Sequence, residues 1–199
     1  MKNSMWSLKL STSALVLIPA AVGINYIGKL FAGLLKLPLW LDAIGTMLAA
    51  MLAGPVVGAI CGAINNIIYG LTMDPISFIY ALTSIGIGLA VGVMAYKGRI
   101  TGIGSAVVVG IVAAVVATVI STPINIGFWG GQTGNVWGDL VFAWMVAHHF
   151  PVWMASTVDE FVVDVPDKIA TAIVAYGIFK GLPQKMTILF HHENETEQL

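Results

Sequence analysis

DEFVVDVPDKIATAIVAYGIF (residues 159–179) joins a charged segment directly to an apolar one. The apolar half, residues 169–179, has the composition of the middle of a membrane helix. The other half holds five charged residues within ten positions: Asp159, Glu160, Asp164, Asp167 and Lys168. Because charge beside hydrocarbon is costly, ionisable residues at this place indicate a binding site or a structural ion pair.

The composition of the whole chain indicates an integral membrane protein. Of its 199 residues, 58% are hydrophobic and 10% are charged, and the mean hydropathy is +0.90. Soluble domains carry about 25% charged residues, so this chain has too few polar side chains to cover a soluble surface. The net charge of −1, without a basic patch, argues against a nucleic-acid partner. The single cysteine, Cys61, excludes an intramolecular disulfide.

The apolar runs predict an all-α membrane protein, a compact bundle of six transmembrane helices. A helix needs about 20 apolar residues to cross a bilayer. Glycine, proline and charged residues divide the chain into six candidate spans: 10–27, 39–53, 56–71, 76–96, 103–120 and a last one that ends near 179. The second span is short, which predicts a tilted or partly re-entrant helix ending at Gly54-Pro55. We expect residues 1–185 to form a single domain and residues 186–199 a flexible cytoplasmic tail.

Residues 121–154, between the fifth and sixth spans, do not have the pattern of a membrane helix. Their first part is rich in Gly, Asn and Trp, which predicts a structured loop. The second part, VFAWMVAHHFPVWM (residues 141–154), predicts an interfacial or partly inserted helix, since Trp favours the membrane–water boundary. His148 and His149 are adjacent, so on a helix they point about 100° apart and do not readily chelate one metal together.

The start of the sixth span has two interpretations. Asp164, followed by Pro166, is typical of a helix that begins near residue 165 behind a capping carboxylate. Alternatively, the helix begins near Thr157 and bends at Pro166. In that case Glu160, Asp164 and Lys168 share one helix face at a spacing of four, and Asp164 and Lys168 can pair.

The basic residues predict that both termini are cytoplasmic. With six spans, one side of the membrane receives Lys29 and Lys36, and the other receives a larger set: Lys2, Lys9, Lys97, Arg99, Lys180 and Lys185. Cytoplasmic loops carry the excess of basic residues. The connections at residues 28–38, 72–75 and 121–154 then face outward, together with the charged start of the last span.

Small residues recur at a spacing of four along the third, fourth and fifth spans. The three ridges are Gly54, Gly58 and Gly62, then Ser84, Gly88 and Gly92, and then Gly102, Ala106, Gly110 and Ala114. Such ridges let helix backbones approach closely in lipid. They predict internal packing of the bundle or, for at least one ridge, a face that docks another membrane subunit.

Polar and aromatic residues gather at the predicted outer ends of the spans. Aromatic rings beside amides and carboxylates suit a pocket for a small, flat, polar molecule. The candidate binding residues are Trp40, Asp42, Asn66, Tyr69, Asn125, Trp129, Gln132, Asn135, Trp137, Asp139, Glu160, Asp164 and Lys168.

Each group also has a structural interpretation. Asp42 is placed to cap the helix of the second span, and Asn65 and Asn66 are placed to bond between helices. The tryptophans can serve as boundary anchors, and the charges before the last span can be a helix cap with an ion pair.

Two stretches carry a resemblance to a known family. LPLWLDAIGTMLAAMLAGPVVGAICGAINNIIYG (residues 37–70), followed by a Gly-rich fourth span, and DVPDKIATAIVAYGIFKGLP (residues 164–183) resemble the substrate-binding S component of energy-coupling factor (ECF) transporters. These are vitamin-uptake systems of prokaryotes. The likeness covers nearly the whole chain as a pattern of hydropathy and punctuation, with a short second span and a Gly-Pro turn.

The resemblance implies a binding subunit of the plasma membrane that is not itself an enzyme. It implies a vitamin site at the outer face and docking onto a coupling transmembrane subunit that carries two cytoplasmic ATPases. Many members carry Ala-x-x-x-Ala in span one for that docking; here Ser7 and Ser11 give a weak substitute, and Gly58 and Gly62 offer another small-residue face. A cobalt or nickel version would use an N-terminal histidine, which this chain lacks, so the resemblance implies an organic substrate, no metal and no cofactor.

Carboxylates, amides and tryptophans together suit an aromatic heterocycle that donates hydrogen bonds or carries positive charge. A vitamin, a vitamin precursor or a nucleobase-like compound fits this description. The alternative function is a self-sufficient small secondary transporter or channel, a class often built from internal repeats, of which the sequence shows no convincing example. Motifs that bring catalytic Ser, His and Asp residues together in an enzyme are also not found.

Overall fold

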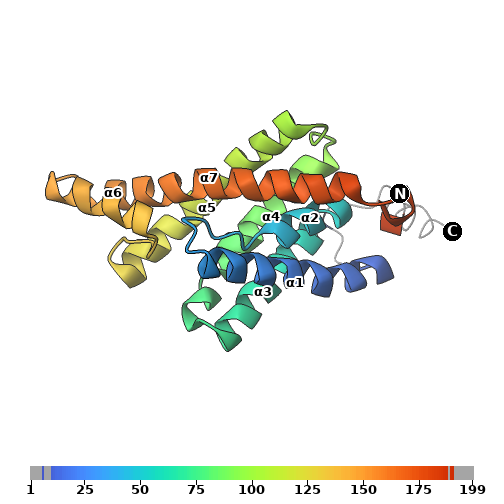
Figure 1. Cartoon of the computed structure of the whole chain (residues 1–199), viewed down its shortest axis with the longest axis horizontal. Coiled ribbons are helices and arrows are strands. Elements are labelled where there is room, and N and C mark those ends of the chain that lie inside the picture. Colours follow the sequence, from blue (N-terminus) through green and yellow to red (C-terminus); the bar gives the residue numbers. More distant parts are fainter. Residues whose placement is uncertain (1–5, 7–9, 188, 191–199) are drawn as a thin grey trace.

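The computed structural model describes residues 6, 10–187 and 189–190, and all regular structure in these residues is helical. In chain order the elements are α1 (Thr12–Leu34), α2 (Ile44–Ala53), α3 (Pro55–Thr72), the 3-10 helix η1 (Pro75–Phe78), α4 (Ala81–Tyr96), α5 (Ile103–Trp129), α6 (Val136–Ala147) and α7 (Val152–Gly181). Figure 1 shows α7 running most of the length of the molecule, with α6 beside its first turns. α1 begins and α7 ends at one end of the molecule, whereas α6 lies at the other (Figure 1).

The lengths of the helices fit an α-helical membrane protein. α1, α3 and α5 are long and apolar enough to cross a bilayer, whereas α2, α4 and α6 are shorter apolar helices. α7 has 30 residues, which corresponds to roughly 45 Å, but charged side chains interrupt its apolar sequence.

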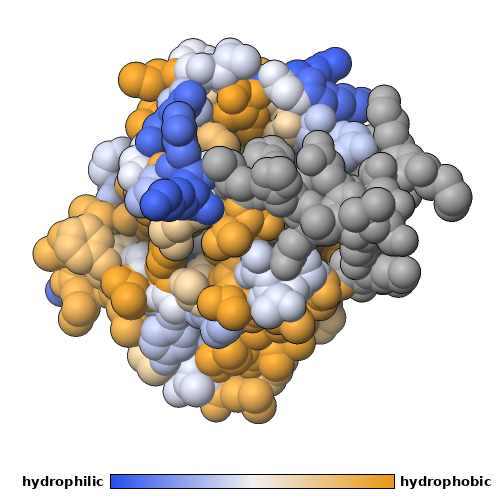
Figure 2. Space-filling model, turned by 90° about the vertical axis from the view of Figure 1, so that its right-hand side faces the viewer, coloured by the Kyte–Doolittle hydropathy of each residue, from blue (hydrophilic) through white to orange (hydrophobic). Residues whose placement is uncertain are grey.

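The outer surface of the bundle is strongly hydrophobic. Figure 2 looks onto the end of the molecule where α7 ends, and hydrophobic residues cover much of the flanks while hydrophilic residues gather in patches on this face. Large apolar side chains on three helices point outward: Val16 is 69% exposed, Leu82 61% and Val119 68%. An apolar surface of this extent suits contact with lipid.

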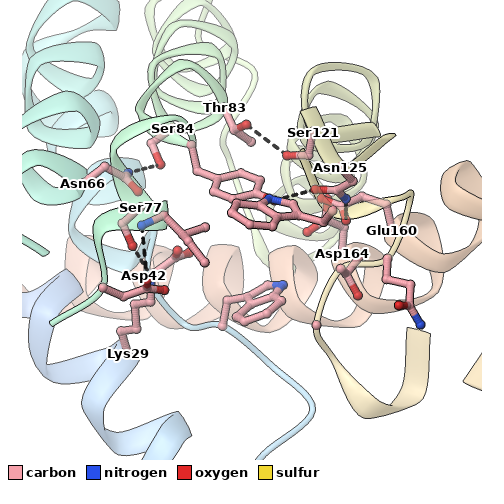
Figure 3. A pocket seen from close by; sticks show the side chains of 18 of the residues that line it. Lys29, Asp42, Asn66, Ser77, Thr83, Ser84, Ser121, Asn125, Glu160 and Asp164 are labelled. Atoms are coloured by element: carbon pink, nitrogen blue, oxygen red, sulfur yellow. Dashed lines mark hydrogen bonds between the residues drawn. The ribbon is translucent and has the colours of Figure 1, made fainter. Parts of the chain in front are cut away.

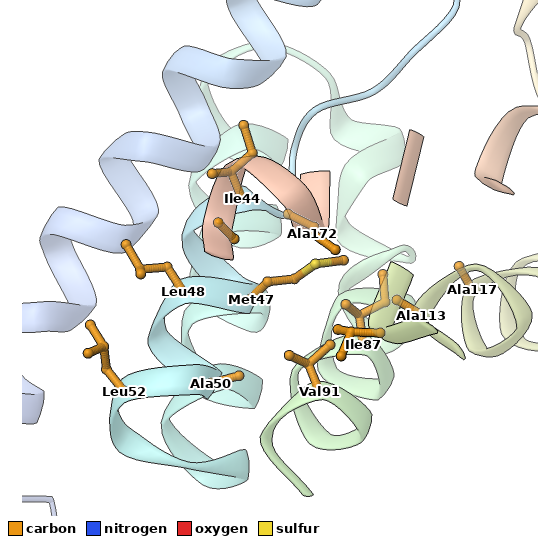
Figure 4. Close-up of a cluster of buried hydrophobic side chains, with 13 residues drawn as sticks. Ile44, Met47, Leu48, Ala50, Leu52, Ile87, Val91, Ala113, Ala117 and Ala172 are labelled. Atoms are coloured by element: carbon orange, nitrogen blue, oxygen red, sulfur yellow. The ribbon is translucent and has the colours of Figure 1, made fainter. Parts of the chain in front are cut away.

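The short helix α2 occupies the centre of the bundle. Eight of its ten residues are buried, and it packs against α1, α3, α4 and α7. Met47 lies in a cluster with Ile87 and Val91 of α4, and with alanines of α5 and α7 (Figure 4). The predicted shortness of this segment is confirmed, because ten residues make about 15 Å of helix, half of the hydrocarbon thickness.

The turn between α2 and α3 depends on Gly54 and Pro55. Gly54 has φ 88° and ψ −178°, a conformation that glycine alone adopts readily. Pro55 follows at the start of α3, where its missing N–H costs no helical hydrogen bond. The predicted Gly-Pro turn is therefore confirmed.

The small-residue ridges pack inside the bundle. A Cβ atom on Gly88 of α4 would collide with the backbone of Gly58, and one on Gly62 of α3 would lie 2.7 Å from the Ser84 carbonyl oxygen. A Cβ atom on Gly110 of α5 would lie 2.5 Å from Cα of Ile169 in α7. These ridges therefore bring α3 against α4 and α5 against α7.

The residues predicted to dock another subunit do not form an exposed face. Gly58 and Gly62 are buried between α3, α2 and α4, so their positions support internal packing only. Ser11 is the N-cap of α1, where its Oγ accepts a hydrogen bond from the Ala14 backbone N–H at 3.1 Å. Ser7 lies outside the described residues, as does most of the predicted tail, residues 186–199.

α5 extends nine residues further than the fifth predicted span. Residues 121–129 are helical and Pro123 lies within them, so the predicted loop across residues 121–154 is wrong for this part. In lipid, backbone groups need intrahelical partners, so a helix continues through a proline that would end it in water. α5 ends at Trp129, its C-cap Gly130 has φ 66°, and residues 136–147 form α6.

α7 is one continuous helix from Val152 to Gly181 and contains Pro166. Asp164 is therefore not a capping residue, and a helix beginning near residue 165 is ruled out. The alternative, a helix that begins near Thr157 and contains Pro166, agrees with the structure in placing Glu160 and Asp164 inside one helix, but the helix begins five residues earlier, at Val152. Asp164 and Lys168 lie one turn apart, with Asp164 Oδ1 3.7 Å from Lys168 Nζ.

Candidate functional site

A cavity of about 490 Å³ lies at the end of the bundle where α1, α3 and α5 end and α4 begins (Figure 3). This volume is in the range of small-molecule sites. Its walls come from α1, α3, α4, α5, α6, α7 and the segments between them. The lining residues are Lys29, Trp40, Asp42, Asn66, Asp74, Ile76, Ser77, Tyr80, Thr83, Ser84, Ile87, Ser121, Asn125, Trp129, Gln132, Thr133, Gly134, Asp139, Glu160, Asp164 and Lys168.

Most of the candidate residues chosen from the sequence meet around this cavity. Those that line it are Trp40, Asp42, Asn66, Asn125, Trp129, Gln132, Asp139, Glu160, Asp164 and Lys168. They come from segments that are far apart in the chain and share one end of the bundle, because consecutive helices run in opposite directions.

Three candidate residues lie elsewhere. The Tyr69 ring lies behind the wall, with Lys29 Nζ 3.9 Å from its centroid and the Tyr26 ring beside it. Asn135 caps α6 by accepting a hydrogen bond from the Trp137 backbone N–H at 3.1 Å. Trp137 points away from the cavity and is 61% exposed.

A buried ion cluster centres on Lys168, which is 3% exposed. Its Nζ lies 2.6 Å from Asp167 Oδ2, 3.6 Å from Asp42 Oδ1 and 3.7 Å from Asp164 Oδ1. Three carboxylates thus surround one ammonium group in the middle of α7. Pairing of this kind lowers the cost of holding charge within a membrane protein.

Asp167 fastens the α1–α2 connection to α7. Its Oδ1 accepts hydrogen bonds from the backbone N–H groups of Trp40 at 3.0 Å and Leu41 at 2.9 Å. Leu41 has φ 50°, a conformation that non-glycine residues adopt at some cost. Asp167 therefore positions both Trp40 and Asp42 in the cavity wall, a role that the sequence did not reveal.

Asp42 does not cap α2, because the N-cap is Ala43 and has no side-chain hydrogen bond. Its carboxylate instead faces Lys168. Burial raises the pKa of the Asp42 carboxyl, but the ammonium groups of Lys168 and then Lys29 outweigh burial, so the pKa lies below its ordinary value.

Hydrogen bonds join three helices, α4, α5 and α7, along the cavity wall. Glu160 Oε2 accepts from Asn125 Nδ2 at 2.9 Å, and the Tyr80 hydroxyl donates to Asn125 Oδ1 at 2.5 Å. The hydroxyls of Thr83 and Ser121 lie 2.9 Å apart (Figure 3). These bonds hold α5 against α7 and α4 against α5.

On the other side of the cavity, Asn66 Nδ2 donates to Ser84 Oγ at 2.6 Å, so the predicted interhelical bond of Asn66 is present. Lys29 Nζ donates to Ser77 Oγ at 3.4 Å (Figure 3). Sequence reasoning missed the Ser and Thr residues of this wall. Their signal was a hydroxyl near the end of an otherwise apolar helix, which alone does not reveal the direction of the side chain.

Two carboxylates, from α7 and α6, hold the α5–α6 connection at adjacent residues. Asp159 accepts from the Thr133 backbone N–H at 3.2 Å and from its hydroxyl at 2.8 Å. Asp139 accepts from the Gly134 backbone N–H at 3.1 Å. Gln132, Thr133 and Gly134 are thereby held in the cavity wall.

Replacing Asp167 by alanine is expected to release the α1–α2 connection, because two backbone N–H groups and Lys168 lose their acceptor. Hydrogen bonds to a charged group each contribute about 1.5–3 kcal/mol, so local opening should rise roughly tenfold or more. Trypsin cleavage after Lys36, which is exposed in this connection, measures the opening. Asp167→Asn keeps an oxygen for both N–H groups and should be cleaved more slowly than Asp167→Ala; equal cleavage of both variants and the parent would contradict the fastening role.

Comparisons with protein-family models, with curated proteins and with solved structures find no match to the chain. The assignment of a function therefore depends on the cavity, its charges and the membrane character of the surrounding helices.

Proposed function

We propose that this chain is the substrate-binding S component of an ECF-type importer in a prokaryotic plasma membrane. It binds a small organic micronutrient, a vitamin, vitamin precursor or nucleobase-like compound, at the outer end of the bundle. A coupling transmembrane subunit and two cytoplasmic ATPases then drive its release inside. In this proposal α1, α2, α3, α4, α5 and α7 are the six crossings, and both termini are cytoplasmic.

The observation that carries the proposal is the cavity of about 490 Å³ at one end of an apolar helical bundle. Aromatic side chains, amides, hydroxyls and charges together line it, as in sites that orient one small polar molecule. The cavity lies among α1, α3 and α5, the helices with the length and hydropathy of membrane spans. This arrangement supports binding of a solute within a membrane protein.

The direct test is native mass spectrometry of the full chain purified from its host membrane. We expect a small organic molecule to remain bound to the parent protein. Replacing Trp129, in the cavity wall, by alanine should weaken binding roughly tenfold or more, since aromatic groups contribute much of the apolar contact in such sites. Trp137→Ala, at an exposed tryptophan of α6, is the matched control and should retain the molecule. Equal retention by both variants would contradict a solute site in this cavity.

A second experiment addresses the coupling module. Cells that express the chain without an ECF coupling subunit and its ATPases should bind the solute but not accumulate it. Undiminished accumulation would favour a self-sufficient secondary transporter.

A further inference from the structure

The positive charge of Lys168 is balanced by the protein's own carboxylates. One of its three partners, Asp167, lies at 2.6 Å, and the other two, Asp42 and Asp164, lie within 3.7 Å. The Asp167 contact is a hydrogen bond, and the three carboxylates together outweigh the single positive charge of Lys168. An anionic solute would therefore find no free cation at this end of the cavity.

Asp164, unlike Lys168, has a polar atom without a partner in the protein. Its side chain lines the cavity and is nearly fully buried. Oδ1 faces Lys168 at 3.7 Å, but the other oxygen, Oδ2, has no hydrogen-bond partner among the described residues. A buried carboxylate oxygen without a donor is costly, so a donor supplied by a bound solute is what this side of the cavity lacks.

The charged residues around the cavity also favour a cationic ligand, because carboxylates outnumber ammonium groups. Its lining contains two ammonium groups, from Lys29 and Lys168, and five carboxylates: Asp42, Asp74, Asp139, Glu160 and Asp164. Glu160 and Asp164 lie on the side of the cavity opposite Lys29 (Figure 3). Lys29 is itself engaged by Ser77 and the Tyr69 ring. Glu160 is therefore a second acidic group on the side of the cavity that holds the unpaired oxygen.

Aromatic rings complete the site. Trp40, Trp129 and Tyr80 all contribute to the lining. The indole face of tryptophan carries partial negative charge and attracts cations, and flat ligands stack well on such rings. Rings and carboxylates thus favour the same kind of ligand.

We propose, building on the binding function above, that the solute is a flat nitrogen cation whose N–H edge pairs with Asp164. Protonated or amino-substituted heterocycles and amidines have this chemistry: a planar group, positive charge and adjacent donors. The edge lies between Asp164 and Glu160, with Oδ2 of Asp164 accepting one of its hydrogens. Asp164 is then the residue that selects for charge.

Three probes of nearly equal shape test this proposal: benzamidine, a cation with a donor fork; benzamide, which is neutral; and benzoate, an anion. Each is titrated by calorimetry into the full chain purified in detergent. We expect benzamidine to bind roughly tenfold or more tightly than benzamide, because bonds to charged groups are the stronger ones, and benzoate to bind most weakly.

Asp164→Asn should remove the preference for benzamidine over benzamide, whereas Asp164→Glu, which keeps the charge, should retain the order of the three probes. The matched control is Glu197→Gln, which makes the same change in net charge near the C-terminus, outside the described residues and the cavity lining. It should alter benzamidine affinity less than threefold. Gel filtration establishes that each variant remains folded.

The outcomes distinguish a failure of the cation assignment from a failure of the proposed solute-binding function. Benzamide or benzoate binding as tightly as benzamidine, or an Asp164→Asn variant that keeps the preference, overturns the cation assignment and leaves a solute-binding subunit. If no probe binds, the charge of the co-purified molecule decides: a cation lost from Asp164→Asn supports the inference, and a neutral or anionic molecule overturns it. No bound probe and no co-purified molecule overturn both.

Discussion

Replacement of Lys168 by methionine is expected to lower the free energy of unfolding by about 3–5 kcal/mol, because breaking a buried ion pair leaves uncompensated charge inside the protein. Lys168 is 3% exposed and faces three carboxylates within 3.7 Å: Asp42, Asp164 and Asp167. Methionine has a similar length, so the change removes the charge with little change in volume. In a thermal-stability assay in detergent, the melting temperature should fall by roughly 6–20 °C.

A lysine on the same helix provides the control. Lys180, in the last turn of α7, is exposed and lies 5.9 Å from the Tyr176 ring centroid, so Lys180→Met should leave the melting temperature nearly unchanged. Combining Lys168→Met with Asp167→Asn should recover part of the loss, since one carboxylate is removed while the backbone of Trp40 and Leu41 keeps an acceptor. A Lys168→Met variant as stable as the parent would show that the carboxylates are not held by this charge.

The sequence predicted the helices with apolar composition, but it did not predict where α5 ends or where α7 begins. Apolar runs gave α1 through α4, although α1 continues to Leu34, through most of the predicted connection at residues 28–38, and α4 begins at Ala81, not at residue 76. Gly54-Pro55 gave the turn between α2 and α3. The end of α5 was missed because Asn125 has the character of a loop residue. In the fold Asn125 is fully buried and bonded to Tyr80 and Glu160, partners 45 and 35 residues away that no local pattern reveals.

The site was predictable to the extent that it follows from topology. Alternating helices bring polar residues at corresponding ends together, which is why widely separated candidates line one cavity. The direction of a side chain was not predictable, so the sequence did not reveal that Trp137 of α6 faces outward. The role of Asp167 was also hidden, since its bonds to Trp40 and Leu41 span 127 and 126 positions.

Replacement of Gly110 by leucine is expected to cost about 3 kcal/mol or more and to disrupt the cavity as well. Overpacking of a filled interior costs about 1–3 kcal/mol even where side chains can yield. Here a Cβ atom would lie 2.5 Å from Ile169 Cα and 2.8 Å from the Lys168 carbonyl oxygen, and backbone atoms cannot rotate away. α7 must therefore shift at the residue that carries the ion cluster. The thermal-stability assay should show a large loss, and solute binding should fall with it.

Gly104 of the same helix gives the matched control. A Cβ atom there would meet nothing within 4 Å, and leucine has a higher helix propensity than glycine, so Gly104→Leu should be neutral or stabilising. The pair separates loss of backbone contact from any general effect of adding a large side chain to α5. If Gly110→Leu is tolerated as well as Gly104→Leu, then α5 and α7 do not pack as closely as described, and Lys168 need not face the cavity at all.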